Sequence, residues 1–218
     1  MASDNFNDNS IGPQWTFTDQ DTVAGTAHSE AGGQLLITAG GVDTWYDYDE
    51  YASLYYPIVG AFTITVKVVS QENVNDWTKT GIMVRNDMTG AGTSTGYIFM
   101  AVTPANNFTF QYDNTHDGFL DTSVQAGSTA FPCWLKIIKT VNGANWDFEG
   151  FYSINGSDYT SVKKWECSSA NDTQDVGMAV ISHADTTTSD NVFDDWSDDI
   201  LVGATGIMTP RSNYWGDL

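Results

Sequence analysis

Basic residues are scarce in this chain. Its 218 residues include 8 Lys and Arg against 28 Asp and Glu, which gives a formal net charge of -20 at pH 7. Nucleic acids and anionic membrane surfaces are bound through basic faces, so neither is an expected partner. The acidic residues are mostly Asp, which favours turns and metal-binding loops. We therefore expect cations, and calcium in particular, to be natural partners.

Long apolar runs are also missing. No stretch approaches the roughly 18 to 20 residues of a membrane helix. The first ten residues, MASDNFNDNS, have neither the basic start nor the apolar core of a signal peptide. We expect a soluble chain without membrane insertion. Composition leaves open whether it is a secreted module given a new start or a protein made without export, such as a virion component.

Cysteine is limited to Cys133 and Cys167. If residues 134–141, 146–153 and 159–166 form a three-strand meander, the two cysteines lie at its opposite ends. Their separation then exceeds the roughly 7 Å between Cα atoms that a disulfide allows. The sequence predicts two buried free thiols.

Helical periodicity is almost absent, and short apolar or alternating blocks are separated by polar turn residues. This pattern predicts one all-β domain, a two-sheet antiparallel jelly-roll sandwich over residues 1–198, followed by a Gly/Pro-broken extension over 199–218. The Asn-Gly pairs in VNGAN and INGSD predict tight hairpins. Strands are expected over 34–40, 61–70, 80–87, 96–104, 107–113, 133–141, 146–154, 159–166, 175–182 and 191–198.

The two-residue period of a strand assigns each side chain to a face. The inward side chains are predicted to be Ile82, Val84, Phe108, Phe110, Tyr112, Val176, Met178 and Val180. Small residues lie beneath hydrogen-bonding and cationic ones on the opposite face, which carries Lys79, Gly81, Arg85, Gln111, Gly177, Ala179 and His183. Such a face is typical of a groove that admits a polar ligand.

Two blocks carry a family resemblance: Trp-x-Lys-x-Gly-Ile-Met-Val-Arg at 77–85 and Ser-His-x-Asp at 182–185. With the segments around them, they resemble the concanavalin A-like jelly-roll modules of the laminin G-like kind, which occur in bacterial and archaeal extracellular proteins. The resemblance runs from about residue 4 to 197. It implies two stacked antiparallel sheets, usually a structural calcium, and a non-catalytic module, extracellular or at the cell surface, that binds glycans or spaces other domains.

The stretch GGVDTWYDYDEYASLYYP, residues 40–57, combines aromatic and acidic residues. In similar modules it is an exposed loop followed by a strand. Trp45, Tyr46 and Tyr48 would then lie in the loop, free to stack on a sugar ring, while residues 51–56 alternate between two faces. The predicted ligand-binding set adds hydrogen-bonding side chains to two indoles and consists of Trp45, Trp77, Lys79, Arg85, Gln111 and His183.

Calcium requires hard oxygen ligands. Terminal strands of such folds usually lie side by side, so we predict a structural calcium site formed by Asp4, Asp194 and Asp195. A second candidate is the segment DNTHDGFLD, where Asp113, Asp117, Gly118 and Asp121 occupy positions of an EF-hand-like loop. Val124 falls where the bidentate Glu should stand, which favours a plain hairpin loop instead.

Catalysis by the laminarinase-like branch of this superfamily needs Glu-x-Asp-x-x-Glu, which the chain lacks. The pairs Asp147 with Glu149 and Asp47 with Asp49 do not have the acid-and-nucleophile spacing, and Lys136 or Lys163 could neutralise the first pair. We expect no enzyme activity, with glycoside hydrolysis as the weakest alternative.

The leading hypothesis is therefore a non-enzymatic, calcium-stabilised module that binds a carbohydrate or a glycan-coated surface. The alternative from another class is a structural subunit of a virion or an extracellular filament. In that case the extension 199–218 would dock on its own domain or on a neighbouring protein, with Tyr214 and Trp215 as anchors and the Leu218 carboxylate available for capture.

Overall fold

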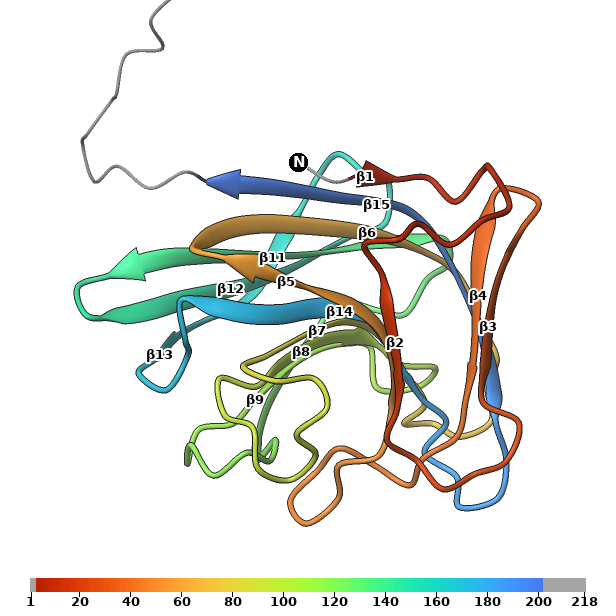
Figure 1. Cartoon of the computed structure of the whole chain (residues 1–218), viewed down its shortest axis with the longest axis horizontal. Coiled ribbons are helices and arrows are strands. Elements are labelled where there is room, and N and C mark those ends of the chain that lie inside the picture. The colour runs from red at the N-terminus through yellow and green to blue at the C-terminus, as the bar shows by residue number, and fades with distance from the viewer. Residues whose placement is uncertain (1–2, 202–218) are drawn as a thin grey trace, which may run out of the picture.

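The computed structural model describes residues 3–201, which form an all-β sandwich with no helix (Figure 1). Within this range no helix is long and apolar enough to cross a membrane. In chain order the strands are β1 (Ser3–Asp4), β2 (Thr16–Asp19), β3 (Ala27–Ala31), β4 (Gln34–Ala39), β5 (Ala52–Val59), β6 (Ala61–Gln71), β7 (Lys79–Arg85), β8 (Ile98–Val102), β9 (Phe108–Tyr112), β10 (Thr122–Ala126), β11 (Cys133–Asn142), β12 (Asn145–Ser153), β13 (Thr160–Cys167), β14 (Thr173–Ile181) and β15 (Ser189–Leu201).

These strands make two antiparallel sheets that lie face to face. The front sheet has the order β10-β9-β8-β7-β14-β5-β2. The back sheet has the order β13-β12-β11-β6-β15-β4-β3, and β1 pairs with β15. Strands distant in the sequence, such as β6 and β15, are neighbours in the sheet, as expected of a jelly roll. The predicted fold class is confirmed.

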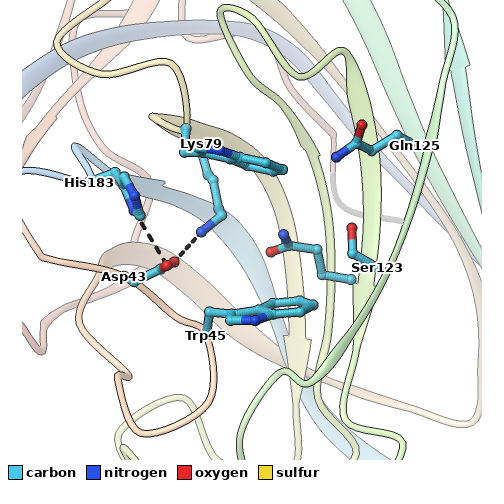
Figure 2. Close-up of a pocket in the computed structure, with 8 residues that line it drawn as sticks. Asp43, Trp45, Lys79, Ser123, Gln125 and His183 are labelled. Atoms are coloured by element: carbon cyan, nitrogen blue, oxygen red, sulfur yellow. Dashed lines mark hydrogen bonds and ion pairs between the residues drawn. The ribbon is translucent and has the colours of Figure 1, made fainter.

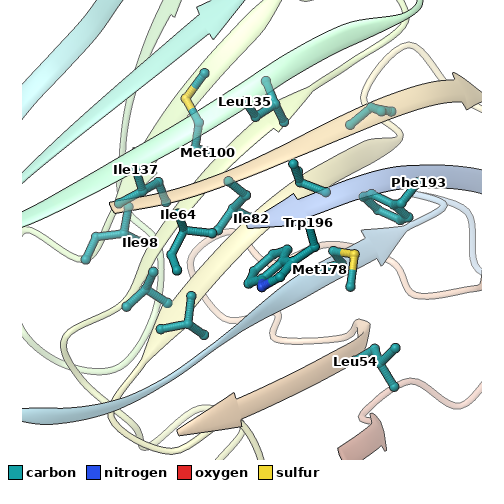
Figure 3. Close-up of a cluster of buried hydrophobic side chains, with 14 of the residues drawn as sticks. Leu54, Ile64, Ile82, Ile98, Met100, Leu135, Ile137, Met178, Phe193 and Trp196 are labelled. Atoms are coloured by element: carbon teal, nitrogen blue, oxygen red, sulfur yellow. The ribbon is translucent and has the colours of Figure 1, made fainter. Parts of the chain in front are cut away.

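The main core lies between the two sheets (Figure 3). It contains the inward sets predicted from alternation, including Ile82 and Val84 of β7, and the back sheet contributes Ile64, Leu135 and Ile137 from the opposite side. The eight predicted inward side chains all belong to this core, in which most are fully buried. A two-residue period with large apolar side chains on one face was therefore enough to orient the central strands.

The ten predicted strands are all present, with ends that differ by at most three residues. The strands that no range anticipated, β1, β2, β3 and β10, are short and half exposed, so they carry little apolar alternation. The alternating segment after residue 50 is β5. Strand β15 continues to Leu201, past the expected boundary at 198, and the prediction that the extension docks concerns residues 202–218, outside the described part.

The two predicted free thiols are confirmed, and both predicted hairpins form, although the second is not tight because residues 154–159 separate β12 from β13. Asn142 pairs with Asn145 across the first hairpin turn, and β12 pairs with β13 across the second. In both turns the glycine after the asparagine, Gly143 or Gly156, adopts a positive φ. Cys133 and Cys167 are buried and unbonded to each other, and burial raises the pKa of the Cys133 thiol to about 12.

A second apolar cluster lies on the outer face of the front sheet, away from the main core. Loops 40–51, 86–97 and 113–121 fold over this face, and Figure 1 shows them on the side of the front sheet remote from the back sheet. The cluster joins residues of the sheet to residues of these loops: Tyr51, Tyr55, Met83, Met88, Tyr97, Phe99, Ala101, Leu120, Ala179 and Ile181. The expected open groove is thus only partly open, because the loops cover much of it.

Arg85 holds the three loops together. Its guanidinium donates to Asp49 Oδ2 at 2.7 Å, to the Ser94 carbonyl at 3.1 Å and to the Gly118 carbonyl at 3.2 Å, which gives at least one contact in each loop. It also lies over the ring of Tyr97, 3.9 Å from the centroid. Arg85 is fully buried, and a neighbouring carboxylate and loop carbonyls take the donors of its two terminal nitrogens. The structure therefore gives Arg85 a structural role, and the prediction that it hydrogen-bonds a ligand stays untested.

Removing one partner of this buried pair should strongly destabilise the fold, because the other partner is left charged and unpaired. We expect Arg85→Met to lower the free energy of unfolding by about 3 to 5 kcal/mol, measured by denaturant titration. The pair of Lys164 and Asp147, which are 2.8 Å apart, is the matched control, since Lys164 is largely exposed. Lys164→Met should leave the midpoint almost unchanged. Equal effects of the two substitutions would contradict the role given to Arg85.

Candidate functional site

The part of the front sheet's outer face that the loops leave open forms a pocket of about 590 Å³. Its lining combines two indoles, a carboxylate, two cationic or ionisable side chains and several neutral polar groups: Asp43, Trp45, Trp77, Lys79, Gln111, Ser123, Gln125 and His183. A concave site of this size, with apolar walls and a few polar groups, is typical of small-ligand binding.

Five separate segments meet at this pocket. Loop 40–51 carries Asp43 and Trp45, and the turn that leads into β7 carries Trp77. Strands β9 and β10 carry Gln111 and the pair Ser123 and Gln125, while His183 follows the end of β14. The Tyr46 N–H donates to the Leu120 carbonyl at 2.9 Å, which ties loop 40–51 to the segment entering β10. The pocket wall therefore depends on long-range loop contacts.

A charged cluster occupies one side of the pocket. The Asp43 carboxylate accepts a hydrogen bond from Lys79 Nζ through one oxygen, and its other oxygen lies 3.4 Å from His183 Nδ1. In Figure 2 these three side chains converge, while Ser123 and Gln125 lie across the pocket from them. Because Lys79 is almost fully buried, its positive charge is largely committed to Asp43.

Ionised Asp43 is the favoured form in this cluster. Burial on its own raises the pKa of Asp43, but the close contact with His183 and the charge of Lys79 outweigh that effect and hold the pKa at about 2. Burial also lowers the pKa of Lys79, and the Asp43 carboxylate opposes that decrease. The cluster thus brings an anion and a cation into the pocket wall together.

Gln111 and Ser123 bring unsatisfied polar atoms to the opposite side. They are cross-strand partners in the β9–β10 pairing. Gln111 is 2% exposed, and neither its Oε1 nor the Ser123 Oγ has a hydrogen-bond partner among the described residues. Buried polar groups are nearly always paired, so two unpaired atoms lining one pocket are notable.

Five of the six predicted ligand-binding residues line this one pocket: Trp45, Trp77, Lys79, Gln111 and His183. Sequence reasoning missed Asp43, Ser123 and Gln125. Ser123 and Gln125 lie on β10, whose sequence TSVQA has one large apolar residue and therefore no clear alternation. Asp43 could have been identified as a site residue from its position among the aromatic residues of 40–57. Nothing in that stretch indicates that Lys79 is its partner.

Tyr46 and Tyr48, which were predicted to be free for stacking, are 60% and 50% exposed. The Tyr46 ring meets the Trp45 ring edge-on, with centroids 5.4 Å apart. In the next strand, Ala52, Leu54 and Tyr56 face the main core, whereas Tyr51 and Tyr55 belong to the cluster beneath the loops. The loop-then-strand interpretation of residues 45–56 agrees with this arrangement.

The predicted calcium ligands do not form a cage. Asp4 does lie beside β15, as expected, but its carboxylate accepts the Phe6 N–H at 3.0 Å and the Trp15 indole N–H at 2.8 Å. Asp194 pairs with Lys67 at 2.9 Å. Over residues 3–201, no three His, Cys, Asp or Glu side chains are grouped to hold a metal ion. Asp195 lines the same hollow as Asp4 and Asn5. The calcium site stays a prediction, and it takes no part in the function proposed below.

The second calcium candidate is a loop closed by its own hydrogen bonds. Asp113 accepts the N–H groups of Asp117 at 3.1 Å and Gly118 at 2.9 Å. Asp121 accepts from Asn114 and from Thr115. The carboxylates are thus committed to backbone donors, as in the plain hairpin loop that the sequence favoured.

The acidic pairs considered for catalysis lie apart from the pocket lining. On β12, Asp147 pairs with Lys164, because Glu166 faces Asp147 in register and Lys164 reaches it from a neighbouring position. Of the two lysines expected to neutralise this acidic pair, Lys136 interacts electrostatically with Glu149. Of the other pair, Asp49 is bound to Arg85. Asp43 is the carboxylate that the described lining contains.

No protein-family model matches the sequence, and neither does any curated protein sequence. Solved structures do resemble the fold. A functionally unknown protein from Saccharomyces cerevisiae has a TM-score of 0.66 at 18% identity, and the match covers 87% of this chain and 98% of that one. The lectin from Bauhinia forficata in complex with GalNAc has a TM-score of 0.57 at 9% identity and covers 90% and 96%.

The GH43 protein BlXynB from Bacillus licheniformis has a TM-score of 0.65 at 16% identity. That match covers 90% of this chain but 38% of BlXynB, so this chain spans well under half of that protein. Identities this low show the fold alone. The chain has the two-sheet antiparallel jelly roll of the concanavalin A-like kind.

The pKa of Asp43 makes stability depend on pH in a defined window. Because its folded pKa of about 2 lies below the usual 3.8, ionised Asp43 stabilises the fold above about pH 4 and loses that contribution as the pH falls through about 2. The pH-dependent part should be about 2 kcal/mol. We expect the difference in unfolding free energy between the wild type and Asp43→Asn to shrink from pH 5 to pH 2.5. A difference that stays constant in denaturant titrations would contradict this, and Asp47→Asn controls for the loss of one charge.

Proposed function

We propose that this protein is a non-enzymatic module that binds carbohydrate in the pocket between Trp45, Trp77 and the β9–β10 strands. The observation that carries the proposal is one concave site with two indoles and with buried polar atoms that lack partners. The lectin neighbour, whose structure contains GalNAc, supports the proposal at the level of the fold.

A sugar has the surface that this pocket complements. Its ring presents apolar C–H faces, which pack on indoles, and a rim of hydroxyl groups, which need hydrogen-bond partners. Trp45 and Trp77 provide the first kind of contact, and Gln111 and Ser123 provide the second. A purely apolar ligand would leave these polar atoms unpaired, as they are in the free protein, and would gain no hydrogen bond from them.

The site gives little support to hydrolysis. Glycoside hydrolases need two carboxyl groups, one of which must exchange a proton near the working pH. Asp43 is one carboxyl group, and contacts with His183 and Lys79 hold its pKa at about 2. We therefore propose binding without catalysis. Such a module would act outside the cell or at its surface, where glycans are displayed.

The alternative of a virion or filament subunit was based on the absence of a signal-peptide pattern and on the C-terminal extension. Its anchors, Tyr214 and Trp215, lie outside the described residues, and no observation within 3–201 favours this role over binding. We therefore do not pursue it as a second function.

Binding should be found on a glycan array and then measured by titration calorimetry with the best sugar. We expect Trp45→Ala and Trp77→Ala each to weaken binding about tenfold or more, since a lost ring contact of about 1.4 kcal/mol corresponds to a tenfold change. Trp134→Ala is the matched control, because this indole lines a different hollow beside Ser197 of β15. The proposal fails if no sugar binds, or if Trp134→Ala abolishes binding while the pocket variants retain it.

A further inference from the structure

The unpaired atoms in the pocket indicate what kind of sugar it takes. Gln111 Oε1 and Ser123 Oγ come from paired positions on adjacent strands that line the pocket, and both atoms are buried and without a partner among the described residues. Strand pairing holds such positions about 5 Å apart at the backbone. Both oxygens can accept a hydrogen bond, so together they suit a ligand with two adjacent donor groups.

The charges around the pocket argue against an anionic ligand. The chain carries a formal charge of -20, which repels anions at long range. Within the pocket, Asp43 faces both groups that could bind an anion, namely Lys79 and His183. An anionic sugar would have to compete with Asp43 for these groups in a poorly solvated site.

Resting on the proposed function, we infer that the pocket selects an uncharged sugar that offers two adjacent donors to Gln111 and Ser123, with Asp43 excluding acidic sugars. On this inference the two acceptors gain hydrogen-bond partners only when a sugar binds. Two buried acceptors without partners destabilise the free protein. Replacing them with apolar groups should therefore stabilise the fold and weaken sugar binding, whereas residues with a structural role would destabilise the fold when replaced.

The variants Gln111→Met and Ser123→Ala test this prediction. We expect each to raise the melting temperature of the free protein or leave it unchanged, and to weaken sugar binding about tenfold or more. Thr109→Val is the matched control, because Thr109 is also on β9 and fully buried with an unpartnered hydroxyl, but does not line the pocket. It should stabilise the protein without altering binding. Lower melting temperatures for Gln111→Met and Ser123→Ala, or unchanged affinity, would overturn the assignment.

The charge selectivity is tested with galactotriose, xylotriose, mannotriose and chitotriose as neutral probes and with trigalacturonic acid as an acidic probe. We expect the best neutral probe to bind at least tenfold more tightly than trigalacturonic acid, and Asp43→Asn to narrow that ratio by freeing Lys79 and His183. If trigalacturonic acid binds more tightly than every neutral probe, the inference is wrong while the proposed function stands. If no sugar binds the wild type, in calorimetry or on the array, both are wrong.

Discussion

The buried ion pair of Arg85 and Asp49 is the interaction on which the outer face of the front sheet depends. A buried guanidinium needs partners for its donors, and here a carboxylate and loop carbonyls accept from its two terminal nitrogens, whereas its Nε has no hydrogen-bond partner among the described residues. Arg85 therefore draws loops 40–51, 86–97 and 113–121 onto the sheet. The apolar cluster of Tyr51, Met88 and Leu120 then packs beneath those loops.

Strand β7 shows why one half of the outer face of the front sheet is covered by loops while the other half is open. Lys79 and Arg85 lie six residues apart on one face of β7, and each is paired with an aspartate of loop 40–51. Arg85 and Asp49 lie beneath the loops, whereas Lys79 and Asp43 lie at the pocket wall. The loop that closes over one end of the strand thus delivers Asp43 and Trp45 to the other end. Assembly of the pocket is a consequence of how this loop is anchored.

Much of this arrangement could be predicted from the sequence, because alternation is a local signal. Residues such as Val84 and Phe110 are apolar on one face of a strand, and this orients the sheets and places Lys79, Gln111 and His183 on the outer side. Whether an outer side chain is covered or lines the pocket depends on loops that are distant from it in the sequence. Nothing local distinguishes Arg85, which is enclosed, from Lys79, which reaches the pocket.

The same limit explains the residues that were missed. Ser123 lies on an edge strand with too little apolar content to be recognised, although its pairing with Gln111 defines the pocket. Asp4 lies beside β15 as expected, but its carboxylate accepts a hydrogen bond from the Trp15 indole, a contact that the sequence alone does not indicate. Strand order brings segments together, and side-chain partners then decide what they can bind.

The central claim is that the anchored loops create one sugar-binding pocket between Trp45 and Trp77. The most direct measurement is nuclear magnetic resonance of the indole N–H groups of the eight tryptophans during titration with neutral oligosaccharides, with assignments from Trp45→Phe and Trp77→Phe. The account predicts saturable shifts of the Trp45 and Trp77 signals, while the Trp134 and Trp196 signals stay in place. Unchanged indole signals, or shifts confined to Trp134, would contradict it.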